Sequence, residues 1–103
     1  MANFVEVTVA EAAKMIAECQ VMILDRRDLS SYKQGHIEGA MMAHDGLVES
    51  LIKKRDINTP VLIYCYRGNS SKELAALFVQ FGYEEVYSMA GGYVEWKQVH
   101  GHE

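Results

Sequence analysis

The chain has 103 residues, half of them hydrophobic and 23% charged, which is typical of one folded globular domain spanning residues 1–103 and too apolar for a disordered chain. Its formal net charge of -4, from 14 acidic and 10 basic residues, argues against a general nucleic-acid binder, which usually carries a basic stripe. No apolar run approaches the ~20 residues that cross a bilayer, and Met1–Phe4 carries no basic and apolar signal, so we expect a cytoplasmic protein without membrane contact.

The first part of the chain predicts a helix followed by a buried strand. The hydroxyl of Thr8 stands three residues before the carboxylate of Glu11, and apolar residues then recur at helical spacing. This pattern predicts a helix over Val9–Cys19 that begins with a capping box. The apolar run Val21–Leu24, ending at Asp25, is typical of a strand buried on both faces of a parallel sheet.

The middle of the chain predicts short elements. Leu29–Gln34 is a polar helical stretch that Gly35 ends, and Ala40–Ala43 is compatible with a short strand. Apolar residues at helical spacing predict an amphipathic helix over Gly46–Arg55, and Asn58–Pro60 predicts a turn after it.

The last part of the chain contains the clearest strand, Val61–Cys65. A loop over Tyr66–Asn69 follows, and then a helix over Ser70–Phe81. Glu85–Met89 predicts a final strand, and Gly91–Trp96 a final helix. Strands that alternate with helices at such short separations indicate an α/β fold with a mainly parallel sheet.

The candidate site is Cys65, because function gathers where strands of a parallel sheet end and loops lead into helices. In the loop that follows, Gly68 and Asn69 tolerate positive φ, and Ser70 or Ser71 can cap the next helix. We therefore predict a tight turn whose successive backbone amides converge above the sulfur of Cys65.

A thiolate in such a nest meets partial positive charge from the amides and the helix terminus. Its pKa should fall from about 8.5 toward neutrality, so a separate base becomes unnecessary. Arg67 is the one full positive charge in the loop, and we expect it to bind an anionic substrate such as thiosulfate and to stabilise the charged sulfur. The alternative is an unreactive cysteine buried at a strand end.

Several segments, in order and along nearly the whole chain, resemble the rhodanese homology domain. The loop itself most resembles that of the short single-domain bacterial thiosulfate sulfurtransferases of the GlpE type. The segments that carry the resemblance are Asp25–Arg27, Gly35–Ala40, Val61–Ser71, Gly82–Tyr83, Val86–Tyr87 and Gly91–Gly92 with Trp96.

The resemblance implies a five-stranded parallel sheet between helices and a ping-pong sulfur transfer without cofactor or metal. Cys65 would attack the outer sulfur of thiosulfate, or of another sulfane-sulfur donor, and sulfite would leave. The loop amides from Tyr66 to Ser70 would then hold a persulfide. Cyanide in assays, and a small thiol or a thioredoxin-like protein in cells, would accept the sulfur.

Three alternatives stay open. A related branch of phosphatases carries an arginine at the sixth position after its cysteine, but Ser71 stands there in this chain, which argues against phosphatase or arsenate reductase activity. A persulfide carrier for a partner protein needs the same chemistry as the enzyme. A catalytically silent interaction module would not need the intact Cys65.

Supporting roles are expected for residues around the site. Arg27 matches the family arginine and should form a structural salt bridge, Asp25 should brace the loops at the strand ends, and His36 should make a structural hydrogen bond in its Gly-His-Ile turn. Met41–His44 departs from the Asn-Ile-Pro-like segment of many relatives, so the local turn there is not predicted.

Cys19 and the carboxyl-terminal residues have weaker signals. We expect a reduced Cys19 with a structural role, a resolving thiol being the alternative. His100, His102 and Glu103 are interpreted as a frayed terminus rather than a metal site.

Overall fold

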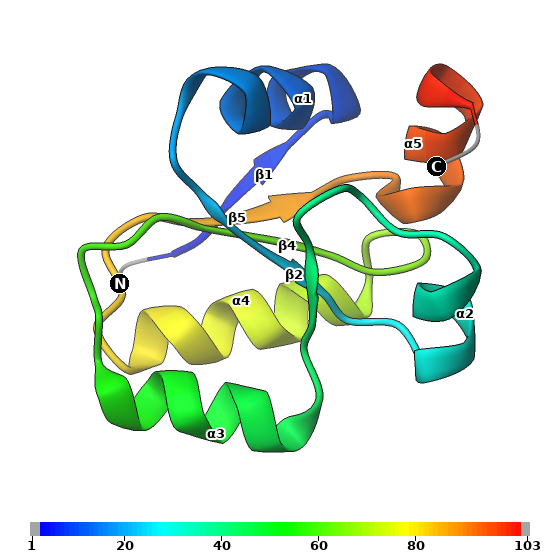
Figure 1. Cartoon of the computed structure of the whole chain (residues 1–103). Coiled ribbons are helices and arrows are strands. Elements are labelled where there is room, and N and C mark those ends of the chain that lie inside the picture. Colours follow the sequence, from blue (N-terminus) through cyan, green and yellow to red (C-terminus); the bar gives the residue numbers. More distant parts are fainter. Residues whose placement is uncertain (1–2, 102–103) are drawn as a thin grey trace.

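The computed structural model, which describes residues 3–101, contains one sheet of five strands (Figure 1). The strands are β1 (Val5–Val7), β2 (Met22–Asp25), β3 (Met41–Met42), β4 (Val61–Tyr64) and β5 (Val86–Met89). Their order across the sheet is β1-β5-β4-β2-β3, and every neighbouring pair is parallel. This confirms the parallel α/β sheet.

Helices cover both faces of this sheet. They are α1 (Val9–Glu18), α2 (Leu29–Gln34), α3 (Asp45–Lys54), α4 (Ser70–Gln80) and α5 (Gly92–His100). Figure 1 shows α1 and α5 on one face, α3 and α4 on the other, and α2 beside the end where β2 and β4 terminate. The three-layer arrangement buries both faces of the central strands, as parallel sheets require.

The central strand β4 divides its side chains between two cores. Leu62 and Tyr64 pack into the cluster under α1 and α5, whereas Val61 and Ile63 pack into the cluster under α3 and α4. Since side chains alternate along a strand, Cys65, which follows β4, belongs to the α4 side. Because Cys65 lies on the same side of the sheet as Val61 and Ile63, its sulfur points toward the start of α4.

The edge strand β1 was not predicted from its own residues. Val5 pairs with Tyr87 of β5 and Val7 with Met89, while the exposed Glu6 forms an ion pair of 2.9 Å with Lys72 on α4. An edge strand of three residues with one buried side chain is too short to show an alternation of apolar and polar residues. Its strand conformation is therefore set by its pairing with β5.

Several predicted boundaries need small corrections. The capping box at Thr8 and Glu11 is confirmed. α3 begins at Asp45 rather than Gly46, because the imidazole of His44 accepts a hydrogen bond of 3.2 Å from the Leu47 amide and caps the helix. α5 continues past Trp96 to His100.

Candidate active site

The sulfur of Cys65 lies at the first turn of α4 and is almost entirely shielded from solvent, with 2% of the residue exposed. The backbone amides of Gly68 and Ser71 point to Sγ at 3.2 and 3.3 Å. The hydroxyl of Ser71 lies 3.4 Å from Sγ and accepts from the thiol. Three polar groups of the loop and helix therefore surround one sulfur atom.

These contacts stabilise the charged form of the sulfur. Burial by itself raises the pKa of the Cys65 thiol, but hydrogen bonds from the Ser71 and Ser70 hydroxyls and from the amides of Ser71 and Gly68 outweigh it. The net effect lowers the pKa from its ordinary value to about 7. Near neutral pH a large fraction of Cys65 is thus a thiolate, the nucleophilic form.

The backbone conformation of the loop and the cap of α4 differ from the prediction. Gly68 has φ +99, but Asn69 has an ordinary φ of -93 and needs no positive φ. Neither serine caps α4: Asn69 takes the N-cap position without a side-chain cap, and Ser70 and Ser71 are the first helical residues. The expected capping role was wrong, because the hydroxyls of both serines form hydrogen bonds with the sulfur of Cys65 instead.

The loop is held from the other side by the first turn of α5. The amide of Tyr93 donates to the carbonyl of Cys65 at 2.8 Å, and that of Val94 to the carbonyl of Tyr66 at 3.1 Å. Gly92, with φ +62, lies so close that a Cβ there would stand 2.3 Å from the Tyr66 carbonyl oxygen. Only glycine permits this approach.

Ser88 on β5 is a site residue that the sequence reasoning missed. It is 1% exposed, and its hydroxyl lies 2.8 Å from that of Ser71. If Ser88 donates to Ser71, the Ser71 hydroxyl is free to donate to the Cys65 thiolate. A serine placed two residues after Val86, on the same buried face of an apolar strand, was the signal that could have revealed it.

Asp25, Arg27 and Tyr64 form a buried polar cluster beside the loop. The Arg27 guanidinium donates to both Asp25 carboxylate oxygens, at 3.0 and 2.7 Å, and to the Gly35 carbonyl at 2.6 Å. The Tyr64 hydroxyl donates to Asp25 at 2.6 Å and accepts from the Ile37 amide. Burial by itself lowers the pKa of Arg27, but the hydrogen bonds to Asp25 and its negative charge outweigh this effect and raise the pKa overall. The guanidinium therefore stays charged.

The remaining predicted site residues lie around this centre. The ring of His36 stacks on Tyr32 and its Nδ1 lies 2.7 Å from the Tyr32 carbonyl, so it contacts α2 and not the sulfur. Arg67 is exposed and, with Tyr66, Asn69 and Ser70, lines a hollow of about 340 Å³ over Cys65.

Tyr66 belongs both to this hollow and to the surface, being 43% exposed. Its hydroxyl donates to the Asp28 carboxylate at 2.6 Å and lies 3.0 Å from the Ser31 hydroxyl. These bonds tie the loop to the start of α2, and the bond from Tyr66 lowers the pKa of Asp28.

The segment Met41–His44, whose turn was not predicted, is positioned by its neighbours. Met41 and Met42 pair with Leu24 and Asp25. The Ala43 amide donates to the Asp25 carbonyl at 2.8 Å, and Arg26 donates to the Ala43 carbonyl at 2.5 Å.

Cys19 lies far from this centre. It is free and exposed, and it lines a cavity with Val21 and Pro60 at the amino ends of the strands. Five residues of extended chain from Pro60 to Cys65 span about 16 Å, so Cys19 cannot resolve a Cys65 persulfide within one molecule. Its exposure does not match a structural role either.

Two further sequence-based expectations concern metals and membranes. Over residues 3–101 no cluster of three potential ligands is arranged to hold a metal ion, whereas His102 and Glu103 lie outside the described residues. In the same part of the chain, no helix has the length and apolar character that crossing a bilayer demands.

Comparison with known proteins agrees with this geometry. Residues 8–99 match the family described as the Rhodanese-like domain. The chain belongs to the rhodanese family. Within it, the chain is similar to the thiosulfate sulfurtransferase GlpE of Pseudomonas paraeruginosa, with 38% identity covering 87% of this chain and 82% of that protein.

Two other relatives cover almost the full length of this rhodanese-family chain. The thiosulfate sulfurtransferase GlpE of Tolumonas auensis is 34% identical over 97% of this chain and 94% of its own. A crystal structure from Staphylococcus saprophyticus has a TM-score of 0.80 and 25% identity, covering 97% of this chain and 99% of that one. The fold and the family predicted from the sequence are therefore confirmed.

Proposed function

We propose that this rhodanese-family protein is a thiosulfate sulfurtransferase that works through a persulfide on Cys65. The observation that carries the proposal is the environment of Sγ, where two amides and the Ser71 hydroxyl surround a buried sulfur with a pKa of about 7. The names of the relatives, thiosulfate sulfurtransferase GlpE, supply the substrate.

The first half-reaction forms the persulfide. The Cys65 thiolate attacks the outer sulfur of thiosulfate, a new S–S bond forms, and the bond between the two thiosulfate sulfur atoms breaks. Its electron pair leaves with sulfite. Splitting the transfer into two displacements on a covalent intermediate lowers the barrier of each.

The loop has unused donors for the outer sulfur of that persulfide. Within residues 3–101, the amides of Arg67, Asn69 and Ser70 form no hydrogen bond, and they belong to the loop that borders the hollow of about 340 Å³. Arg67 adds a positive side chain at the same rim, where it would attract the thiosulfate dianion. Preorganised donors of this kind stabilise charge that develops on sulfur.

In the second half-reaction a thiophilic acceptor takes the outer sulfur and releases the Cys65 thiolate. Cyanide serves in an assay, and a small thiol or a thioredoxin-like protein is the acceptor that we expect in a cell. Such acceptors need reduced thiols, and both cysteines of the chain are free, which supports the cytoplasm as the location.

Intact-mass measurement tests the central step. Incubation with thiosulfate alone should add one sulfur atom to the wild-type protein, and to a Cys19→Ser variant equally, because Cys19 is remote from the loop. Cys65→Ser should gain nothing. A wild type without the added sulfur, or a Cys65→Ser variant that gains as much, contradicts the proposal.

Steady-state turnover distinguishes an enzyme from a silent interaction module. Thiosulfate and cyanide should yield thiocyanate with the wild type and none above background with Cys65→Ser. A persulfide that forms with thiosulfate but passes to neither cyanide nor small thiols would favour the carrier function over the enzyme.

A further inference from the structure

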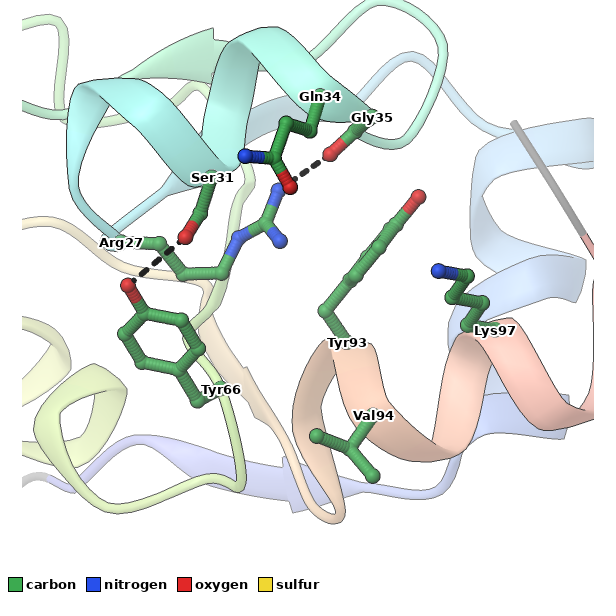
Figure 2. Close-up of a pocket in the computed structure, with 8 residues that line it drawn as sticks. All are labelled: Arg27, Ser31, Gln34, Gly35, Tyr66, Tyr93, Val94 and Lys97. Carbon is green, nitrogen blue, oxygen red and sulfur yellow. Dashed lines mark hydrogen bonds between the residues drawn. The ribbon is translucent and has the colours of Figure 1, made fainter.

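A second cavity adjoins the hollow over Cys65. It has a volume of about 240 Å³ and lies between α2 and α5 (Figure 2). We call it the acceptor groove; the lining residues that matter below are Arg27, Ser31, Gln34, Tyr66, Tyr93 and Lys97.

The acceptor groove carries one uncompensated positive charge. The charge of Arg27 is matched by the buried Asp25, whereas Lys97 is exposed and forms no ion pair with any residue from 3 to 101. Figure 2 shows Lys97 beside Tyr93 on α5, with the Tyr93 ring between Lys97 and Arg27 in this view. Among residues 3–101 no acidic side chain lines it, although the chain as a whole is acidic.

Hydrogen-bonding groups complete the lining. Arg27 uses Nε and Nη2 for Asp25 and Gly35, while its Nη1 bonds to none of the residues described. The guanidinium carbon lies 4.1 Å from the centre of the Tyr93 ring, which holds the group in place. The Ser31 hydroxyl and the Gln34 amide stand on the opposite wall.

The acceptor groove and the hollow over Cys65 share one lining residue. Tyr66 lines both the groove and the hollow over Cys65. Its ring position is fixed at one end by Asp28, and the loop is fixed at the other by the first turn of α5, which also carries Tyr93. A molecule that reaches past Tyr66 can therefore occupy both spaces.

We propose that the acceptor groove binds the carboxylate end of a small acceptor thiol, with Lys97 as the principal cationic partner and Arg27 Nη1 as a further donor. This rests on the proposed function. The thiolate of the acceptor attacks the outer sulfur of the Cys65 persulfide, a new S–S bond forms, and the bond to Sγ breaks. Its electron pair returns to Sγ, and the outer sulfur leaves on the acceptor as a perthiolate that keeps its negative charge.

Size and charge favour this occupant over the sulfur donor. Thiosulfate must place its outer sulfur against Cys65, and it fits within the hollow without reaching past Tyr66. A thiol with an amino-acid or peptide backbone extends by about 3.5 Å per residue, so its carboxylate can lie outside the hollow, on the side of Tyr66 that lines the groove. A single added cation suits one carboxylate group.

Matched acceptors test the proposal on the persulfidated protein. N-acetylcysteine carries a carboxylate and N-acetylcysteine amide does not, so the ratio of their second-order rate constants isolates the charge. Lys97→Gln should lower that ratio about threefold, the effect of one partly exposed ion pair. Lys97→Glu should lower it further because it reverses the charge.

Lys14→Gln is the matched control. It removes the same charge from α1, where Lys14 lines the cavity at the amino ends of the strands, so the ratio should equal that of the wild type. An unchanged ratio in Lys97→Glu, or an equal change in Lys14→Gln, overturns the proposal. So does a fall in the rate of persulfide formation from thiosulfate as large as the fall in the ratio, because the groove would then serve the donor.

A binding measurement separates this proposal from the catalytic one. N-acetyl-S-methylcysteine, which cannot accept sulfur, should shift the NMR signals of Tyr66, Tyr93 and Lys97 in the Cys65→Ser protein, and more weakly with Lys97→Gln. These shifts without a persulfide on the wild type would refute the proposed function and leave the groove standing. A persulfide without these shifts would refute only the groove.

Discussion

Replacing Ser71 with alanine should raise the pKa of Cys65 and slow its reaction near neutral pH. The hydroxyl of Ser71 lies 3.4 Å from Sγ, and Ser71 contributes to the lowered pKa through both its side chain and its amide. Ser71→Ala removes the hydroxyl and keeps the amide, so it measures the side chain alone.

The expected size of the effect follows from the hydrogen bond that is lost. A hydrogen bond to a charged group contributes about 1.5–3 kcal/mol, and one pKa unit corresponds to about 1.4 kcal/mol. The pKa of Cys65 should thus rise from about 7 by about one to two units. At pH 7 the thiolate fraction falls from about one half to about one tenth or less.

The pH dependence of alkylation by iodoacetamide measures this shift directly. A Cys19→Ala background removes the exposed second thiol, so that only Cys65 reacts. At pH 7 the rate constant for Ser71→Ala should be at least about fivefold lower than in the parent, and the two profiles should converge above about pH 10. Ser50→Ala, on the exposed side of α3, is the control and should follow the parent profile.

Ser88→Ala tests the same hydrogen-bonded series, which runs from the Ser88 hydroxyl through the Ser71 hydroxyl to the sulfur of Cys65. It removes the partner of the Ser71 hydroxyl but leaves that hydroxyl beside the sulfur, so the rise in the pKa of Cys65 should be smaller. An apparent pKa in Ser71→Ala equal to that of the parent would refute the reasoning. It would mean that amides alone set the charge state of the sulfur.

Three further predictions concern the fold around the site. Gly92→Ala would place a Cβ 2.3 Å from the Tyr66 carbonyl, so the loop must move; persulfide formation should slow at least tenfold, and the melting temperature should fall by several degrees. Tyr64→Phe leaves the buried Asp25 without one donor, which should cost about 1–3 kcal/mol in denaturant unfolding, and an unchanged midpoint would contradict the role of that bond. Because the folded-state pKa of Cys65 lies below its unfolded value, the free energy of unfolding should rise between about pH 7 and pH 9 by about 1–3 kcal/mol more in the wild type than in Cys65→Ser; equal slopes for the two proteins would contradict the lowered pKa.

The sequence by itself determined the elements that local rules encode. The apolar run over β4, the loop with its glycine and the periodic face of α4 predicted a strand, a tight turn and a helix around Cys65. The capping box at Thr8 was readable for the same reason, because its two residues are three positions apart. These patterns depend only on near neighbours, and the resemblance to the rhodanese family supplied the sheet as a whole.

Only the tertiary structure decided which distant groups meet. β1 exists because β5 pairs with it, and Ser88 becomes part of the site because β5 places it beside Ser71, 17 residues away in the chain. The two serines that were expected to cap α4 form hydrogen bonds with the sulfur instead, since the register of β4 points Cys65 toward them. Local periodicity cannot encode such contacts, because strand pairing and helix packing set them.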